Sequence, residues 1–447
     1  MSSIATEWLP VLPLFASAFT TLATFVRATL LAVAAILTTG RRTVANLLRT
    51  VDGLTDGDPA SYHRVLSLAQ WSGLSLAALL TRFLIRHFWP QGRIRLVGDD
   101  TVTEHPGRKV YGKARHRDPV RSSHSYTAWR WGHKWVVLAV LVRFPFARRP
   151  WALPVLVALY RSPQDNRKRG RPHRTPAQLL QRLLRLLLRW FPDRRFIFAG
   201  DQNYGSHEMA ESAPRSRGRL HLVSKFPPNA NLYDPPPPYT GHGRPRVKGA
   251  KRPSPQEVVA TAKRTQLNVA WYGGGRRDVE VVSATGHWYK AGRGLVPVRW
   301  VYVHDLTGTH RDEYFYSTDV ALTPQEIIEE YTGRWNIETT FEEARAYLGL
   351  ESTRGWCART VQRAEPCLLG LYSVVALMYW LLPEVDQERG AVDWEGKEAV
   401  TFSDAITAVR RWLWTHWVFP RAGHAEAFAK LPEAFQERLL YALAPAA

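Results

Sequence analysis

The stretch Arg93-Ile94-Arg95-Leu96-Val97-Gly98-Asp99-Asp100-Thr101 decides the fold class, because its alternating polar and apolar residues predict a strand that runs into two acids. The short apolar run Phe196–Gly200 predicts another buried strand, which ends on Asp201. Side chains at the carboxyl ends of strands in an α/β sheet converge on a shared crevice. We therefore expect an α/β protein in which acids from distant segments meet at one edge of a sheet.

A third acid, Glu338, lies in a long predicted helix. The helix begins at Thr323-Pro324-Gln325-Glu326, which is a capping box with proline at the first helical position. It is expected to run to about Leu348, with Gly349 closing it. At about 100° per residue, one face of this helix carries Glu338 together with three neighbours, Tyr331, Arg334 and Arg345.

Two aspartates and a glutamate are hard oxygen ligands that suit Mg²⁺ or Mn²⁺. Two such ions about 3.5–4 Å apart can activate an attacking water or hydroxyl and stabilise the leaving oxygen of a phosphodiester. No nucleophile motif such as Gly-x-Ser-x-Gly occurs, which fits a reaction without a protein nucleophile. From spacing alone, structural ion pairs remain the alternative reading of these acids.

The charge of the chain favours a nucleic-acid partner. Its 447 residues include 60 Lys and Arg against 39 Asp and Glu, a formal net charge of +21. Phosphate neutralisation by such side chains drives binding to DNA without regard to sequence. Tryptophan is frequent at 18 residues, and aromatic side chains among arginines suit stacking on bases. The two cysteines, Cys357 and Cys367, exclude a disulfide scaffold and fit a reducing cytosol.

The pattern of helix and strand signals along the chain predicts five regions. Residues 1–90 read as a helical N-terminal DNA-binding domain, and 91–210 as the first part of an α/β core. Residues 211–320 are rich in strands and loops, 321–385 return to the core, and 386–447 form a helical C-terminal region. The uncharged stretch Leu9–Val26 matches a membrane span in length, but its prolines and threonines favour buried helices, so no membrane is expected.

Three basic segments are candidates for DNA contact. A short helix near Arg41 and Arg42 could bind DNA in the manner of a helix-turn-helix, or it could be a solvated basic face. Arg171 lies in one basic loop, and Arg244 and Arg246 lie in another. An Arg-Gly-Arg-Pro core can enter an A·T-rich minor groove, although a general phosphate contact is the simpler reading.

The motifs together resemble a known family. Tyr331-x-x-Arg334-x-x-x-Glu338-x-x-x-x-x-x-Arg345 is similar to the Tyr/Arg/Glu/Lys signature of insertion-sequence DDE transposases, with arginine in place of the final lysine. The segments 97–101, 198–205 and 170–176 also resemble that family, in the same order. The resemblance implies an RNase H-like catalytic core interrupted by a β-rich insertion domain.

The resemblance also implies roles for particular residues. Asp100, Asp201 and Glu338 would hold two Mg²⁺ or Mn²⁺ ions, with Asp99 open as the alternative to Asp100, and Glu342 and Glu343 as rivals to Glu338. Tyr331, Arg334 and Arg345 would contact DNA near the cut phosphate. Trp288 or Trp300 would accept a flipped base in a hairpin intermediate, although packing in the core is the simpler role for either.

The activity implied is DNA transposition. The enzyme would bind the terminal inverted repeats of its element, hydrolyse phosphodiester bonds at the ends and join those ends to target DNA. Because two ends must be held together, we expect a homodimer on double-stranded DNA, in the bacterial cytoplasm at the nucleoid. The alternative is a transposase-derived DNA-binding protein without catalytic activity, which the intact acids disfavour.

Overall fold

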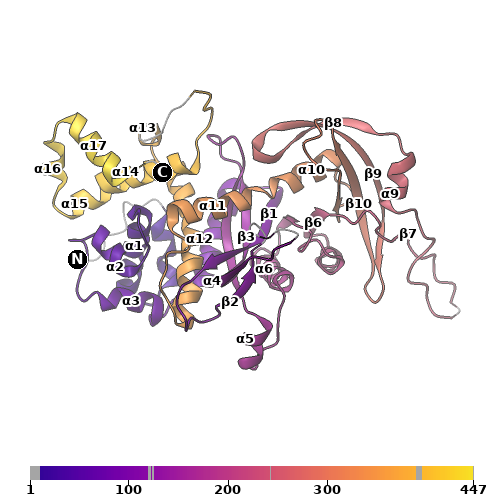
Figure 1. The fold of residues 1–447 in the computed structure, drawn as a ribbon, viewed down its shortest axis with the longest axis horizontal. Helices are drawn as coiled ribbons and strands as arrows, with labels where there is room; N and C mark the ends of the chain where they lie inside the picture. Colours follow the sequence, from indigo (N-terminus) through magenta and orange to yellow (C-terminus); the bar gives the residue numbers. More distant parts are fainter. Residues whose placement is uncertain (1–10, 119–121, 123–124, 242, 389–394, 446–447) are drawn as a thin grey trace.

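The computed structural model describes residues 11–118, 122, 125–241, 243–388 and 395–445. It is a mixed α/β structure in which a large twisted sheet runs through the middle of the molecule, with helices packed mainly at one end (Figure 1). The expected α/β class is thus confirmed. The limits of the five predicted regions remain predictions, because one sheet runs through the core and the proposed insertion without a break.

The sheet has eleven strands in the order β2-β3-β1-β5-β6-β11-β10-β9-β7, with β4 also paired to β3 and β8 to β9. β1 pairs antiparallel with β3 and parallel with β5, and β5 pairs parallel with β6. The strands are β1 (Arg93–Glu104), β2 (Ala114–Arg117), β3 (Trp129–Val142), β4 (Trp151–Tyr160), β5 (Arg195–Gly200), β6 (Leu220–Lys225), β7 (Leu232–Tyr233), β8 (Thr265–Ala270), β9 (Arg276–Lys290), β10 (Gly294–Asp305) and β11 (Glu313–Ser317).

Helices cover both faces of the β1–β3–β4 part of this sheet. The long helices α11 (Asn336–Leu348) and α12 (Ala358–Leu381) pack on one face, and α6 (Pro176–Trp190) contacts β3 and β4. Leu180 of α6 lies against Gly98 of β1, and Arg345 of α11 reaches Thr101 of the same strand. Because alternate residues of a strand point to opposite faces, α6 and α11 lie on opposite sides of β1.

The other helices gather mainly around α12 or lie in the connections between strands. On the N-terminal side are the 3₁₀ helix η1 (Leu12–Ala18), α1 (Leu22–Leu37), α2 (Val44–Thr50), α3 (Ala60–Ser67) and α4 (Gly73–Phe88). Later come α5 (Pro163–Lys168), α7 (His207–Ala210), α8 (Ser212–Arg215), α9 (Pro255–Thr261), η2 (Tyr272–Gly274) and α10 (Pro324–Gly333). The C-terminal set is α13 (Glu384–Glu388), α14 (Phe402–Leu413), the π-helical turn η3 (Trp414–Val418), α15 (Phe419–Arg421), α16 (Ala425–Ala429) and α17 (Glu433–Leu443).

Two expected helices are each interrupted. The expected helix over 323–348 begins with the capping box at Thr323 and ends at Gly349, whose φ of 61° is left-handed, as predicted. It breaks at Arg334 and Trp335, where i→i+3 hydrogen bonds replace the helical pattern and separate α10 from α11. The apolar residues of Tyr62–Phe88 recur at helical spacing and predict one helix, but this stretch is likewise split, because Trp71 pairs with Phe19 between α3 and α4.

The N-terminal apolar stretch is folded into the protein. Leu9 and Pro10 lie outside the described residues. The apolar spacing of Phe15–Val26 predicts one helix, but the structure has the end of η1 followed by the start of α1. Among the described residues, the one helix long and apolar enough to cross a membrane is α12, and 67% of its apolar window is buried inside the protein. A core helix has the same character, because its apolar surface is covered by protein.

Candidate active site

The joint between α10 and α11 brings a cation against two acids. The Arg334 side chain is only 7% exposed, and its guanidinium donates to Asp99 Oδ2 at 2.8 Å and to Glu338 Oε1 at 2.9 Å. Arg334 lies in the i→i+3 turn, while Glu338 lies in the first turn of α11 and Asp99 in β1. A single buried guanidinium therefore links the strand to the helix and holds two carboxylates close together.

Asp201 completes this group of acids. It follows β5 in a tight turn and accepts hydrogen bonds from the backbone N–H groups of Asn203 at 2.9 Å and Tyr204 at 3.2 Å. The pKa of Asp99 is raised to about 7, mainly by burial and also by the nearby charges of Asp201 and Asp100, against the opposing effect of Arg334. Burial also raises the pKa of Glu338, and Asp201 contributes to that shift too. Asp201 therefore lies within electrostatic reach of both other acids.

Asp100 takes different partners. Its carboxylate accepts from Lys134 Nζ at 2.7 Å and from the hydroxyl of Tyr204 at 2.7 Å. Lys134 pairs with Val102 in the β1–β3 ladder, so Asp100, Val102 and Lys134 point to the same face, opposite to Asp99. The structure thus brings Asp99 and Glu338 together on Arg334, with the charge of Asp201 acting on both, and places Asp100, the residue favoured from the sequence, on the other side of the strand.

The rival glutamates differ in their surroundings. Glu343 is paired with Arg149 at 2.9 Å and accepts from the hydroxyl of Tyr372 at 2.6 Å, so its carboxylate joins α11 to α12 and to the segment just before β4. Glu342 contributes to the raised pKa of Glu338, so its charge lies near the group of acids. Glu338 is the glutamate that shares Arg334 with Asp99.

The chemistry of this donor set fits a hard divalent cation, although the acids are not spaced around one as they stand. Within the described ranges, no three acidic, imidazole or thiol groups are placed to hold a single ion. Arg334 lies between Asp99 and Glu338 where a cation would otherwise neutralise them. Burial raises the pKa of both Asp99 and Glu338 against the opposing effect of Arg334, and a divalent cation beside them would favour their ionised forms.

A cavity of about 570 Å³ opens beside Arg334. Its walls come from α10, its joint with α11, β10, β11 and the segment around η2. Tyr272 and His310 stack at 5.7 Å, and Tyr272 meets Trp335 edge-on at 5.9 Å. The aromatic and basic lining residues are Lys225, Trp271, Tyr272, His310, Arg311, Tyr331, Arg334 and Trp335.

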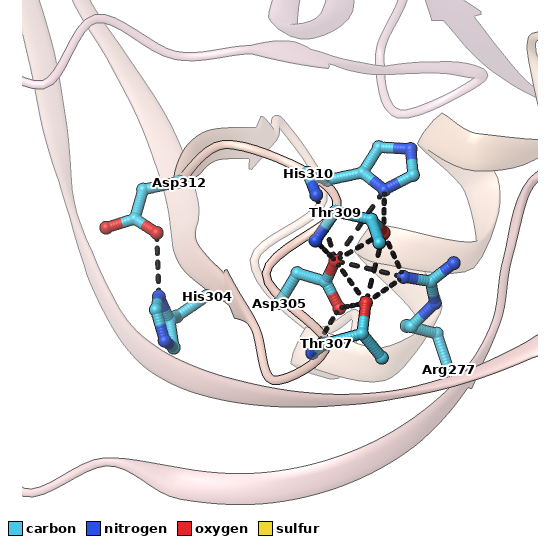
Figure 2. Close-up of polar contacts among 7 residues, drawn as sticks. All are labelled: Arg277, His304, Asp305, Thr307, Thr309, His310 and Asp312. Carbon is cyan, nitrogen blue, oxygen red and sulfur yellow. Dashed lines mark hydrogen bonds and ion pairs between the residues drawn. The ribbon is translucent and has the colours of Figure 1, made fainter.

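One wall of the cavity is a turn organised by a buried aspartate. Figure 2 shows Asp305 accepting from the backbone N–H groups of Thr307, Thr309 and His310 and from Arg277 Nη1 at 2.9 Å. Burial opposes the charge of Asp305, but these hydrogen bonds outweigh it and hold its pKa well below the usual range. The turn thereby fixes the position of the His310 ring against Tyr272.

The aromatic residues expected to take a flipped base lie elsewhere. Trp300 is 1% exposed in an apolar cluster that is separate from the main core and lies in the β9–β10–β11 part of the sheet. Trp288 packs against the rings of His207, Phe226 and Tyr316. Sequence reasoning did not single out Trp271 and Tyr272. Trp335 could have been found, because it directly follows Arg334 of the helix signature.

The predicted DNA-contacting residues divide by exposure. Arg41, Arg171, Arg244 and Arg246 are exposed. Arg42 is buried, and its guanidinium donates to backbone carbonyls within the N-terminal helices and to Tyr347 of α11.

Two members of the helix signature are also engaged within the protein. Tyr331 is 2% exposed and stacks on Phe315 at 4.3 Å. Arg345 is bound to Glu351, Thr101 and the carbonyl of Val102.

Comparison with known proteins places the chain. A search of curated proteins finds no match. A solved structure of a piggyBac transposase synaptic complex with hairpin DNA is similar at 10% identity and a TM-score of 0.43, covering 95% of this chain and 77% of that one. The model of the family "Archaeal putative transposase ISC1217" matches residues 275–369, and that of "DDE superfamily endonuclease" matches residues 14–278. The chain therefore belongs to the DDE superfamily endonucleases and, as its motifs indicated, to the insertion-sequence transposases among them.

Proposed function

We propose that this protein is a transposase that binds the terminal inverted repeats of its element, hydrolyses phosphodiester bonds at the ends and joins the 3′ ends to target DNA. The observation that carries the proposal is that Arg334 bridges Asp99 and Glu338 while the charge of Asp201 acts on both of these acids. The three acids come from two parallel strands and a helix, and the antiparallel β3 and β4 lie beyond β1, an arrangement that supports an RNase H-like core.

Asp99, Asp201 and Glu338 would hold two Mg²⁺ or Mn²⁺ ions, which when bound activate the attacking oxygen and stabilise the leaving one. We assign the first metal-ligand position to Asp99, although the sequence favoured Asp100. The side chain of Asp99 shares Arg334 with Glu338, whereas Asp100 is paired with Lys134. Arg334 would then release one or both carboxylates and turn toward the phosphate of the bound DNA, for which a guanidinium fork is well suited.

The cavity beside Arg334 supports a role in holding a base displaced from the duplex end. Trp335 is 47% exposed, so its ring can receive a stacking partner without unfolding the protein. Tyr272 and His310 provide further ring surfaces, and Arg311 supplies positive charge for the attached phosphate, while Lys225 is paired with Glu313. We assign the flipped base to this cavity in place of Trp288 or Trp300.

The protein would act as a dimer on two double-stranded ends, in the cytoplasm at the nucleoid. Exposed arginines, among them Arg41, Arg171, Arg244 and Arg246, would contact phosphates along the duplex. A net charge of +21 supports this binding. Arg345 would stabilise β1 against α11, since its contacts are to Thr101, Val102 and Glu351.

The decisive experiment incubates the purified protein with duplexes that carry its element's ends, in Mg²⁺ or Mn²⁺, and resolves both strands on denaturing gels. Nicking at the element boundary that disappears in Asp201→Asn and Glu338→Gln, while end binding persists, is the expected result. End binding without nicking in any metal would favour the second candidate, a transposase-derived DNA-binding protein.

A further inference from the structure

The free end of the sheet carries an exposed ladder of aromatic and basic side chains. β2 lies at the edge, and its register with β3 pairs Arg115 with Trp131 and Arg117 with Trp129. Cross-strand partners point to the same face of a sheet, so the four side chains lie together. Trp129 is 48% and Trp131 is 59% exposed. We name this set, Arg115, Arg117, Trp129 and Trp131, the Trp/Arg ladder.

The ladder combines exposed aromatic rings with positive charge. The guanidinium of Arg115 lies 4.7 Å from the ring centre of Trp129, and Lys113 Nζ lies 5.9 Å from that of Trp131. The nearby acids Glu104 and Asp118 contact Arg130, at 2.8 and 3.2 Å. Basic residues on an edge strand also discourage pairing between sheets, but that role does not require two exposed tryptophans.

The ladder shares a face of the sheet with the candidate active site. Asp99 pairs with Val137 on β3, and residues 131 and 137 of that strand point to the same side. Six residues at about 3.3 Å each separate them, so the ladder begins about 20 Å from Asp99 along the strand. The face between them is covered by α11 and α12, since Thr103 and Trp135 are buried against Glu365 of α12, so a strand that reached both sites would pass around these helices.

We propose that the Trp/Arg ladder binds single-stranded DNA, with unpaired bases stacked on Trp129 and Trp131 and the phosphates held by Lys113, Arg115 and Arg117. Exposed rings beside cations are the recurring way in which proteins hold unpaired bases without reading their sequence. The inference rests on the proposed function only in taking DNA as the ligand. It assigns the ladder to strands that have been separated at the cleavage point.

The test measures binding of a fluorescein-labelled oligothymidine of 12 nucleotides by fluorescence anisotropy, in EDTA so that no cleavage occurs. The double variant Trp129→Ala/Trp131→Ala should weaken binding about tenfold or more, since each lost stack contributes substantially to affinity. Trp129→Phe/Trp131→Phe should retain most of the affinity. Tyr441→Ala is the matched control, because Tyr441 is 53% exposed beneath Arg411 at 5.1 Å on a distant helix.

Wild-type affinity in the alanine double variant overturns the inference. So does a changed oligomeric state in size-exclusion chromatography with unchanged oligonucleotide binding, which would make the ladder a contact between copies. If the alanine variant fails to fold, Arg115→Glu/Arg117→Glu tests the same ladder through charge and should also weaken binding. Loss of binding in these variants, from a protein that never nicks its ends, would uphold the ladder while refuting the transposase activity.

Discussion

Asp99 and Asp100 are adjacent in the chain, yet their carboxylates leave β1 on opposite faces of the sheet. Asp99 meets Arg334 at 2.8 Å on the side of α11, whereas Asp100 meets Lys134 at 2.7 Å on the other side. The alternation of a strand makes this separation unavoidable. The two residues therefore have separate roles, which substitution can distinguish.

Asp99→Asn should lower the rate of cleavage at the element ends by about 10³-fold or more, because loss of a metal ligand removes several kcal/mol of transition-state stabilisation. Asp100→Asn should retain cleavage within about tenfold, since it disturbs contacts to Lys134 and Tyr204 that lie on the far face. Initial rates on strand-resolved gels, with end binding measured in parallel, compare the two. If Asp99→Asn cleaved the ends and Asp100→Asn did not, Asp100 would be the metal ligand.

The sequence predicted the strand, the turn and the helix that carry the acids, because local patterns specify them. It could not select between Asp99 and Asp100, because that choice depends on which face of β1 α11 packs against. The resemblance favoured the residue before Thr101, while the fold groups its neighbour with Glu338. The break at Arg334 was also missed. Thr332 and Gly333 weaken the helix at that point, but they do not by themselves end a helix, and the turn is held by tertiary contacts.

Arg41 and Arg42 form a matched pair for separating DNA contact from folding. Arg42→Ala should lower the free energy of unfolding by about 1–3 kcal/mol, because it leaves the buried carbonyl of Ala35 without its charged donor and removes the contacts to Gly40 and Tyr347. Arg41→Ala should change stability by less than about 0.5 kcal/mol and should weaken duplex binding modestly, with a smaller dependence on salt. Urea unfolding and salt-dependent DNA binding test both. Equal stability losses in the two variants would contradict the assignment.

Asp305 should make the free energy of unfolding depend on pH in the acidic range. Its folded pKa is depressed, so its contribution is present above the unfolded value of about 3.9 and declines as the pH falls further. The wild type should lose up to about 1.4 kcal/mol per pH unit from this group below that point. Asp305→Asn should be less stable at pH 7 and should lack this part of the acid-induced loss.

Urea unfolding of the wild type and Asp305→Asn at pH 7, 5 and 3 measures the difference. Asp278→Asn is a control of the same chemistry, because Asp278 is exposed and contacts Asn268 at 2.7 Å. Parallel pH curves for the wild type and Asp305→Asn would show that the turn in Figure 2 is not held by the ionised carboxylate.

Trp335 and Trp300 should respond to substitution in opposite ways. Trp335→Ala removes an exposed ring from the cavity wall, so it should leave the melting temperature nearly unchanged and slow strand processing after the first nick. Trp300→Ala empties a site in the second apolar cluster and should lower the free energy of unfolding by about 3–5 kcal/mol. Thermal unfolding and the time course of nicked and fully cut ends separate these outcomes. If Trp335→Ala processed its ends at the wild-type rate, the displaced base would have to bind outside this cavity, and the aromatic pair Tyr272 and His310 would have only a packing role.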